Sequence, residues 1–233
     1  IYDSFMNEFT LIQKYLRPLT SEAGRGLNDD AAVFKSENKI DYVISTDTLV
    51  EKIHFFGNEN PEDIAKKSLR TNISDLAAMG AEPIYYNLSL SIPKKKIKRF
   101  LIPFTQGLKS DQELFNLKLI GGDLTAASDF ITITITVFGK VPREKAVSRS
   151  GAKNNDLLFV TGVLGLSNIG LKYFKSKNKK FKIAKQKYLI PEPRILLASE
   201  IRNYVNSMID ISDGLVQDAL KISKNSNLEI HIN

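Results

Sequence analysis

The sequence contains no cysteine, and only two of its 233 residues are histidine, His54 and His231. The lack of cysteine excludes disulfides, zinc thiolates and thiol nucleophiles, and it fits a reducing cytoplasm. The two histidines are not spaced as zinc ligands, and no Gly-x-Ser-x-Gly motif accompanies them. Neither a zinc site nor a Ser-His-Asp hydrolase is therefore indicated.

Long apolar runs are also missing, because no stretch approaches the roughly twenty residues that cross a bilayer. The first residues, IYDSFMNEF, are acidic rather than basic, which does not fit a signal peptide. We therefore expect a cytoplasmic protein with no membrane partner. A hydrophobic share of 42% is enough for a folded core, and the length fits one large domain or two small ones.

Familiar nucleotide and nucleic-acid motifs are absent too. No P-loop and no protein-kinase catalytic loop occurs, and residues 161–167 resemble a dinucleotide-binding loop with the wrong glycine spacing. The net charge of +7 leaves nucleic-acid binding open as an alternative, but the two basic stretches, residues 94–99 and 172–187, match no nucleic-acid-binding module. Attraction of anionic nucleotides is the consequence we expect, without nucleic acid as a partner.

Hydrophobic periodicity predicts an α/β chain with two domains. The clearest strand is residues 130–138, and the clearest helix begins at Asn60 and Pro61 and ends near Gly80. The other expected helices cover residues 5–16, 95–115, 165–174, 194–205 and 214–223, and the other expected strands cover residues 42–45, 86–92, 117–120, 157–160, 208–211 and 228–232. The polar stretch 142–156 suggests an N-terminal α/β domain, residues 1–141, and a C-terminal α/β domain, residues 142–233.

What the sequence does contain is a set of aspartates at or near apolar runs: Asp30, Asp47, Asp75, Asp123, Asp210 and Asp213. Each one alone has an ordinary interpretation as a turn former, a helix cap or a solvated charge. Gathered at strand tips, they would repel one another unless divalent cations lay among them. The segments STDT at 45–48 and DISDG at 210–214 add hydroxyl groups, and such oxygen sets suit Mg²⁺ and phosphate.

Two further side chains have more than one interpretation. Arg149, in the predicted domain boundary, can neutralise phosphate charge during transfer, or it can pair with a surface carboxylate. His54 follows Asp47 by seven residues, so it belongs either to the acidic site or to an ordinary half-buried loop.

Taken together, these motifs resemble the thiamine-monophosphate kinase family, in the superfamily of aminoimidazole ribonucleotide synthetase. The resemblance runs from about residue 9 to the end of the chain and rests on DDAA (29–32), STDTLV (45–50), HF (54–55), NISDLAAMG (72–80), GGD (121–123), SRSGA (148–152), PEPR (191–194) and IDISDGL (209–215). STDTLV followed by HF is more typical of the kinase than of its siblings. Aminoimidazole ribonucleotide synthetase stays open as an alternative, whereas a selenophosphate synthetase would need a cysteine or selenocysteine near its N-terminal loop.

The resemblance implies an enzyme that makes thiamine diphosphate and ADP from thiamine monophosphate and ATP, with several Mg²⁺ ions, by direct γ-phosphoryl transfer. It also implies an aminoimidazole ribonucleotide synthetase-like fold, in which the N-terminal mixed sheet pairs across a homodimer. The family's metal positions fall on Asp30, Ser45, Thr46, Asp47, Asp75, Asp123, Asp210 and Asp213, its ATP positions on Gly121, Gly122, Arg149 and Ser212, and a substrate position on His54. Asp75, expected to bridge several metals, and Arg149 are the expected catalytic residues.

The chain departs from the family pattern in two respects. Asn28 replaces the glycine that usually precedes the aspartate pair, and we expect the asparagine to keep the left-handed turn of that glycine. The family also continues for roughly ninety further residues. We therefore expect the C-terminal domain to be incomplete in this sequence.

Overall fold

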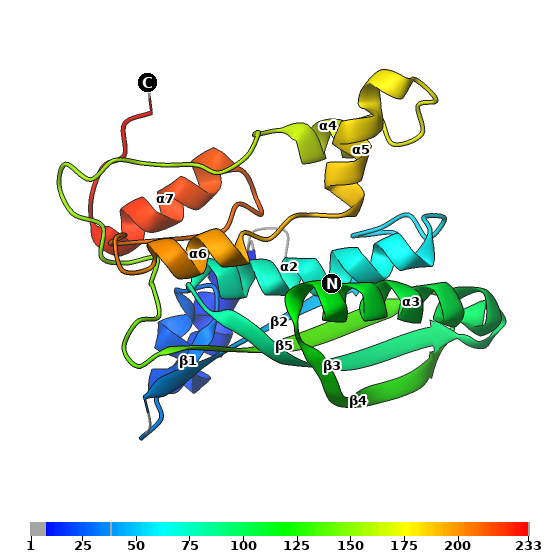
Figure 1. Cartoon of the computed structure of the whole chain (residues 1–233), viewed down its shortest axis with the longest axis horizontal. Helices are drawn as coiled ribbons and strands as arrows, with labels where there is room; N and C mark the ends of the chain where they lie inside the picture. The colour runs from blue at the N-terminus through cyan, green and yellow to red at the C-terminus, as the bar shows by residue number, and fades with distance from the viewer. Residues whose placement is uncertain (1–7, 38, 233) are drawn as a thin grey trace.

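One five-stranded mixed sheet organises the first part of the molecule (Figure 1). A computed structural model describes residues 8–37 and 39–232. The strands are β1 (Ala32–Phe34), β2 (Ile40–Val50), β3 (Glu82–Pro93), β4 (Lys118–Ala127) and β5 (Thr132–Pro142). Their order across the sheet is β1-β2-β5-β3-β4, with β3 and β4 parallel and the other pairs antiparallel.

Helix α2 (Pro61–Ala78) confirms the clearest predicted helix, and it packs an apolar stripe against this sheet. Asn60 caps the helix, since its side chain accepts a hydrogen bond from the Glu62 amide at 3.2 Å. The leucine and isoleucine side chains of the stripe are fully buried, and each contributes roughly 1.5–3 kcal/mol through burial. The chain turns away at Gly80, which adopts a left-handed φ of 68°.

Helix α3 (Ile97–Phe115) lies beside α2 and confirms the helix predicted there. Gly107 allows this approach, because a Cβ at that position would lie 2.4 Å from a backbone oxygen of α2. Across the same interface, Arg70 donates hydrogen bonds to both carboxylate oxygens of buried Asp111 at 2.7 Å. Arg70 also donates to the carbonyl oxygen of Pro191 at 3.1 Å, so it ties the C-terminal part of the chain to both helices.

The alternation of β2 and β5 gives the sheet two different faces. The isoleucine and valine side chains of β5 face the core and are at most 1% exposed. On the opposite face, threonines of the two strands pair with each other: Thr46 with Thr136 and Thr48 with Thr134, each at 2.9 Å between hydroxyl oxygens. The prediction of a strand with one buried face is therefore confirmed for β5, and we call the other surface the threonine face.

Two strands differ from expectation. β2 continues to Val50, so residues 46–48 lie within it rather than at its tip, because β5 pairs with it along its whole length. β4 is an exposed edge strand instead of a short buried one, and Leu124 on it is 61% exposed. It continues through Gly122, where a Cβ would lie 1.8 Å from the carbonyl oxygen of Leu88 on β3. Only glycine fits this pairing.

Between residues 143 and 232 the structure contains helices and no strand. The helices are α4 (Leu166–Lys172), α5 (Lys182–Leu189), α6 (Ile195–Ile201) and α7 (Leu215–Ser226), and they lie on the same side of the sheet as α2 (Figure 1). The strands predicted at 157–160, 208–211 and 228–232 are therefore wrong. A strand needs neighbours for its backbone groups, and segment 157–160 instead lies at the surface, with Phe159 82% exposed. None of the described helices has the length and apolarity of a membrane span.

The helix predicted at residues 5–16 is confirmed over residues 8–16, where an α-helical turn continues directly into a π-helical one, and residues 5–7 lie outside the described part. The short elements are α1 (Glu8–Leu11), a π-helix (Ile12–Leu16) and 3₁₀ turns at Arg17–Leu19, Glu22–Leu27, Lys94–Lys96 and Lys179–Phe181. In the loop before β1, the left-handed residues are Arg25, Gly26 and Leu27, whereas Asn28 has an ordinary φ of −108°. The expectation for Asn28 is wrong because the preceding residues already make the turn. The division into two domains stays a prediction.

Candidate active site

Three of the predicted aspartates meet between the sheet layer and the C-terminal part of the chain. Asp30 precedes β1, Asp75 lies near the end of α2, and Asp210 lies in the loop before α7. Carboxylate oxygens of all three lie within 4.8 Å of one another. We call this group the acidic cluster. An oxygen-only set at this spacing suits a hard divalent cation.

Serine hydroxyls hold two of these carboxylates in place. Ser45 of β2 donates a hydrogen bond to Asp75 at 2.5 Å, and Ser74 of α2 donates to Asp210 at 2.8 Å. The resemblance placed Ser45 in the site, and the structure brings it there. Ser74 was missed, although its position directly before Asp75 in the NISDLAAMG segment could have signalled it.

Arg149 and Asp29 build the support for Asp30. The Arg149 guanidinium pairs with both oxygens of Asp30, with Nε at 3.0 Å. Asp29 accepts hydrogen bonds from the Ser148 hydroxyl at 2.7 Å and from the Arg149 amide at 2.8 Å, and it also pairs with Arg25. Arg149 therefore takes a buried partner rather than a surface one. Asp29 was not assigned a role from the sequence, where it could not be distinguished from an ordinary turn former.

Burial raises the pKa of each carboxylate in the acidic cluster, and the charges of nearby carboxylates add to the rise. Burial, followed by the charges of Asp47 and Asp210, raises the pKa of Asp75 well above 3.8. Burial, followed by the charge of Asp30, raises the pKa of Asp210 to about 6. Burial raises the pKa of Asp30 even though Arg149 pairs with it. The cluster thus resists full ionisation, and a bound divalent cation would relieve that resistance.

The pleat of β2 divides the STDT segment between two faces. Asp47 lies near the acidic cluster, since its charge raises the pKa of Asp75, and its amide donates to the Asn72 side-chain oxygen at 2.9 Å. Burial raises the pKa of Asp47, and His54 acts in the opposite direction. Thr46, by contrast, directs its hydroxyl to the threonine face. The structure therefore does not bring the Thr46 hydroxyl to the three aspartates.

Asp123 is not brought to the acidic cluster within one chain either. It lies exposed on β4, which is three strands away from β2, or roughly 14 Å by strand spacing. In the sheet register Asp47 aligns with Gly122, so the next residue, Asp123, projects from the opposite face to Asp47. Gly121 lies on the same edge strand. Gly121, Gly122 and Asp123 therefore form a group that is separate from the acidic cluster.

The DISDG loop is held by a residue that the sequence reasoning missed. Three successive amides, those of residues 212–214, donate to one carboxylate oxygen of buried Asp218 at 3.0 Å. Lys221 lies 2.8 Å from Asp218 and from Asp213. The Ser212 amide is therefore held in place two residues after Asp210. Asp213 is exposed and pairs with Lys221. An aspartate in the first turn of a helix was the available signal for Asp218.

His54 lies in the turn after β2 and has a defined orientation. Its Nδ1 accepts a hydrogen bond from the Val50 amide at 2.9 Å. In the neutral imidazole the hydrogen therefore sits on Nε2, which is a donor. The turn directly follows β2, the strand that carries Ser45 and Asp47.

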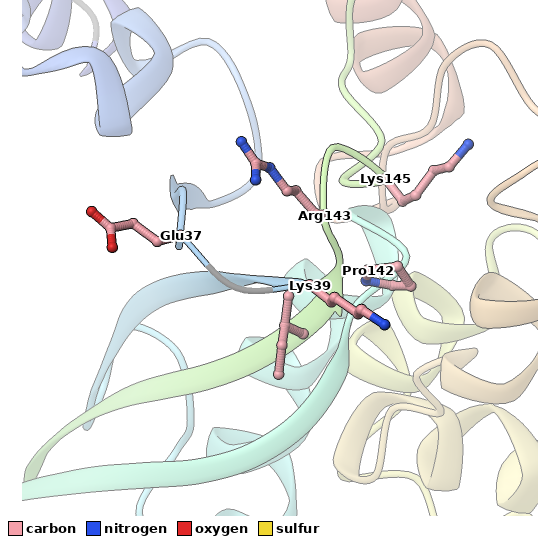
Figure 2. Close-up of a pocket in the computed structure, with 6 residues that line it drawn as sticks. Glu37, Lys39, Pro142, Arg143 and Lys145 are labelled. Atoms are coloured by element: carbon pink, nitrogen blue, oxygen red, sulfur yellow. The ribbon is translucent and has the colours of Figure 1, made fainter.

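Two cavities differ in their relation to this site. A cavity of about 800 Å³ lies at the start of β2 and the end of β5. It is lined by Glu37, Lys39, Ile40, Pro142, Arg143 and Lys145. Figure 2 shows its labelled charged side chains spreading apart, so they do not converge on a ligand. A cavity of about 250 Å³ is lined by Arg25, Asn28, Asp29, Ser148, Ser150 and Asn225. It shares Asp29 and Ser148 with the support of Asp30, and it therefore adjoins the acidic cluster.

Comparison with known proteins agrees with this arrangement. Residues 28–141 match the family described as AIR synthase related protein, N-terminal domain. The chain is 39% identical to thiamine-monophosphate kinase of Buchnera aphidicola subsp. Schizaphis graminum, over 97% of this chain and 72% of that protein. It is 38% identical to thiamine-monophosphate kinase of Escherichia coli (strain K12), over 94% of this chain and 69% of that protein.

Solved structures show the same fold. AaThiL complexed with AMPPCP and TMP matches with a TM-score of 0.87 and 30% identity, over 96% of this chain and 74% of that one. Thiamine monophosphate kinase from Aquifex aeolicus matches with a TM-score of 0.78 and 30% identity, over 84% of this chain and 67% of that one. The expected mixed α/β fold is confirmed, and the chain belongs to the thiamine-monophosphate kinase family.

Proposed function

We propose that this chain transfers the γ-phosphoryl group of ATP to the phosphate of thiamine monophosphate. A bond forms between an oxygen of the acceptor phosphate and the γ-phosphorus, while the bond from the γ-phosphorus to the bridging oxygen of ADP breaks. The observation that carries the proposal is the acidic cluster, with its carboxylate oxygens within 4.8 Å. The relative AaThiL, complexed with AMPPCP and TMP, supports the choice of substrates.

The acidic cluster fits Mg²⁺ on the chemistry of its donors. All ligands are oxygens, and the raised pKa of Asp75 and Asp210 marks a place where negative charge lacks compensation. Bound there, Mg²⁺ would supply neutralisation of phosphate charge. Asp47 and Asp213 are proposed as further ligands at the border of the cluster. Thr46 is proposed as a ligand through its backbone carbonyl alone, since its hydroxyl points to the threonine face.

The chain's own groups bind and orient the phosphates. Arg149 offers a guanidinium beside Asp30, where it can hold phosphate oxygens of ATP in a two-pronged manner. Ser212 lies in the loop that Asp218 holds, and we propose that it contacts the nucleotide. The acceptor phosphate is already anionic, so the transfer needs positioning and neutralisation rather than a strong general base. That requirement explains why the site contains no cysteine and needs no catalytic histidine.

A homodimer would reconcile the position of Asp123 with its proposed metal role. Asp123 lies on an edge strand with exposed apolar neighbours, since Leu119 and Ile120 are 48% and 55% exposed. Exposed edges of this kind invite pairing with another chain. We propose that a second copy covers β4, so that Asp123 of the partner subunit, with Gly121 and Gly122, completes each acidic cluster.

Mixing two inactive variants tests this dimer. If each site combines Asp75 of one chain with Asp123 of the other, a dimer of one D75N and one D123N chain has one intact site and one doubly altered site. Random mixing makes half of the dimers mixed, so about one quarter of the wild-type activity should return. The measurement is product formation after the two variants are unfolded together and refolded. Activity that stays at the level of the separate variants, or a fully active D123N variant, would contradict the arrangement.

The activity itself is tested with ATP, Mg²⁺ and thiamine monophosphate, following thiamine diphosphate by chromatography. Product that requires Mg²⁺ supports the proposed function. Mg²⁺-dependent ATP binding without product would indicate a different acceptor substrate, such as that of the related aminoimidazole ribonucleotide synthetase. A chain that binds no ATP but binds nucleic acid, with an affinity that falls steeply with salt, would support the nucleic-acid alternative.

A further inference from the structure

One cation of α2 has no role in the reaction described so far. Lys67 lies eight residues before Asp75 on the same helix, a distance of about 12 Å along the axis. Its Nζ donates a hydrogen bond to the carbonyl oxygen of His54 at 3.0 Å and lies 3.8 Å from the ring centroid of Tyr188. The lysine therefore joins three separate elements: α2, the His54 turn and α5.

The surroundings of Lys67 offer it little compensation by charge. Glu59 acts on it electrostatically, but the Glu59 carboxylate already accepts three hydrogen bonds from the backbone amides of residues 56–58. Burial lowers the pKa of Lys67 to about 8. Lys67 is half-buried, so its ammonium gives up part of its hydration and needs other partners in its place. The ammonium group of Lys67 finds these partners in the His54 carbonyl oxygen and the Tyr188 ring.

The contact with Lys67 holds the main chain of a residue whose ring is held separately. The Val50 amide holds Nδ1 at 2.9 Å, and Lys67 holds the backbone carbonyl of the same residue. Together they tie the His54 turn to β2, which carries Ser45, and to α2, which carries Asp75, and they leave Nε2 as the remaining donor of the ring. The turn thus presents one ring donor from the same strand and helix that carry Ser45 and Asp75.

Aromatic packing connects the same turn to the segment directly after α4 and to α5. Phe56 stacks on Phe174, with ring centroids 5.0 Å apart, and Phe174 meets Tyr188 edge-on at 5.8 Å. Tyr188 is 8% exposed and carries Lys67 on its ring face. The electron-rich face of an aromatic ring attracts a cation that lies above it. The ring contact therefore gives Lys67 a fixed position from which to hold His54.

We propose that Lys67 is a positioning residue for the acceptor: it holds the His54 turn so that Nε2 meets the phosphate group of the phosphate-monoester substrate. The inference rests on the proposed function, because it names the substrate group that the His54 turn contacts. Lys67 acts through His54 and does not itself touch the reacting atoms.

Kinetics of three lysine variants test the proposal. In K67M the hydrogen bond and the charge are lost while the aliphatic length is kept, and we expect the KM for thiamine monophosphate to rise about tenfold, with the KM for ATP and kcat changed less than threefold. K67R should recover most of the acceptor affinity. K66M is the matched control, because Lys66 lies on the same helix and pairs with Glu62 instead. Its acceptor KM should equal that of the wild type.

An imidazole spectrum tests the same proposal without any substrate. The chain has only His54 and His231, so a long-range ¹H–¹⁵N NMR spectrum contains two ring systems. In the wild type and in K66M, His54 should show the tautomer with hydrogen on Nε2. In K67M its ring shifts should move toward a mixture of tautomers, while those of His231 stay unchanged. Thermal unfolding of K67M and K67R shows whether each variant is folded.

The outcomes separate the inference from the proposed function. A wild-type protein that forms no thiamine diphosphate defeats the proposed function, and the His54 spectrum then still decides whether Lys67 orients the imidazole. An active wild type with an unchanged acceptor KM in folded K67M overturns the inference. So does an unchanged His54 tautomer in K67M. A raised acceptor KM together with a changed His54 spectrum, both restored by K67R, supports it.

Discussion

Replacing Asp75 with asparagine should lower kcat/KM for thiamine diphosphate formation by about 10³-fold or more. Asp75 is the carboxylate whose pKa is raised by the charges of Asp47, Asp210 and Asp30 together, so it lies at the centre of the acidic cluster. Asparagine keeps the shape and can still accept a hydrogen bond from Ser45, but it removes a charge from the proposed Mg²⁺ ligands. Steady-state kinetics over a range of Mg²⁺ concentrations gives the measurement.

The same substitution should stabilise the metal-free protein. The neighbouring carboxylates repel a charged Asp75, and the neutral amide relieves that repulsion, so the free energy of unfolding should rise at neutral pH. Asp63→Asn, in the first turn of α2, is the control and should leave the kinetics unchanged. A D75N variant that keeps kcat/KM within tenfold of the wild type would remove Asp75 from the proposed metal site.

The second large effect is on stability as a function of pH. Groups whose folded-state pKa is raised stabilise the fold below their unfolded pKa and lose that contribution as pH rises through the folded value. The free energy of unfolding of the metal-free protein should therefore fall as pH rises from about 4 through about 6. The rise in the pKa of Asp210 from 3.8 to about 6 corresponds to roughly 3 kcal/mol. Asp75 extends the fall to higher pH.

Mg²⁺ should reverse this fall, because it binds the ionised carboxylates of the folded state. At one hundred times its dissociation constant it adds about 2.7 kcal/mol. Urea unfolding between pH 4.5 and 8, with EDTA and with Mg²⁺, measures both curves. A D75N D210N double variant should show a flatter curve that Mg²⁺ hardly changes. Identical curves with and without Mg²⁺ in the wild type would mean that the acidic cluster does not bind the ion.

Local sequence signals were sufficient to predict α2, whose ends carry capping and stop residues, and β5, whose residues alternate between apolar and polar. Asn60, Pro61 and Gly80 fixed the ends of α2, and the alternation of β5 fixed its two faces. Within the site, the meeting of Asp30, Asp75 and Asp210 also followed the family pattern. In each case the information lies in the segment itself or in motifs whose order matches a known family.

Features set by pairing between distant segments could not be predicted in this way. The end of β2 depends on how far β5 accompanies it, which placed Thr46 within a strand and away from the acidic cluster. The apolar segment 157–160 has the composition of a strand but no neighbour to pair with in the described structure. Asp218 and Ser74 were missed because their roles depend on loops and carboxylates that are remote in sequence or defined only in three dimensions.

Because β2 directs Ser45 and Asp47 to one side and Thr46 and Thr48 to the other, the length of this strand matters more than most of its individual side chains. Deleting or inserting a single residue ahead of Ser45 would exchange the two sets at once. Hydroxyls would then turn toward Asp75, and Asp47 would turn onto the threonine face. Substitutions on the threonine face therefore leave the acidic cluster in place, whereas a change in the number of residues alters the face that every side chain of β2 occupies.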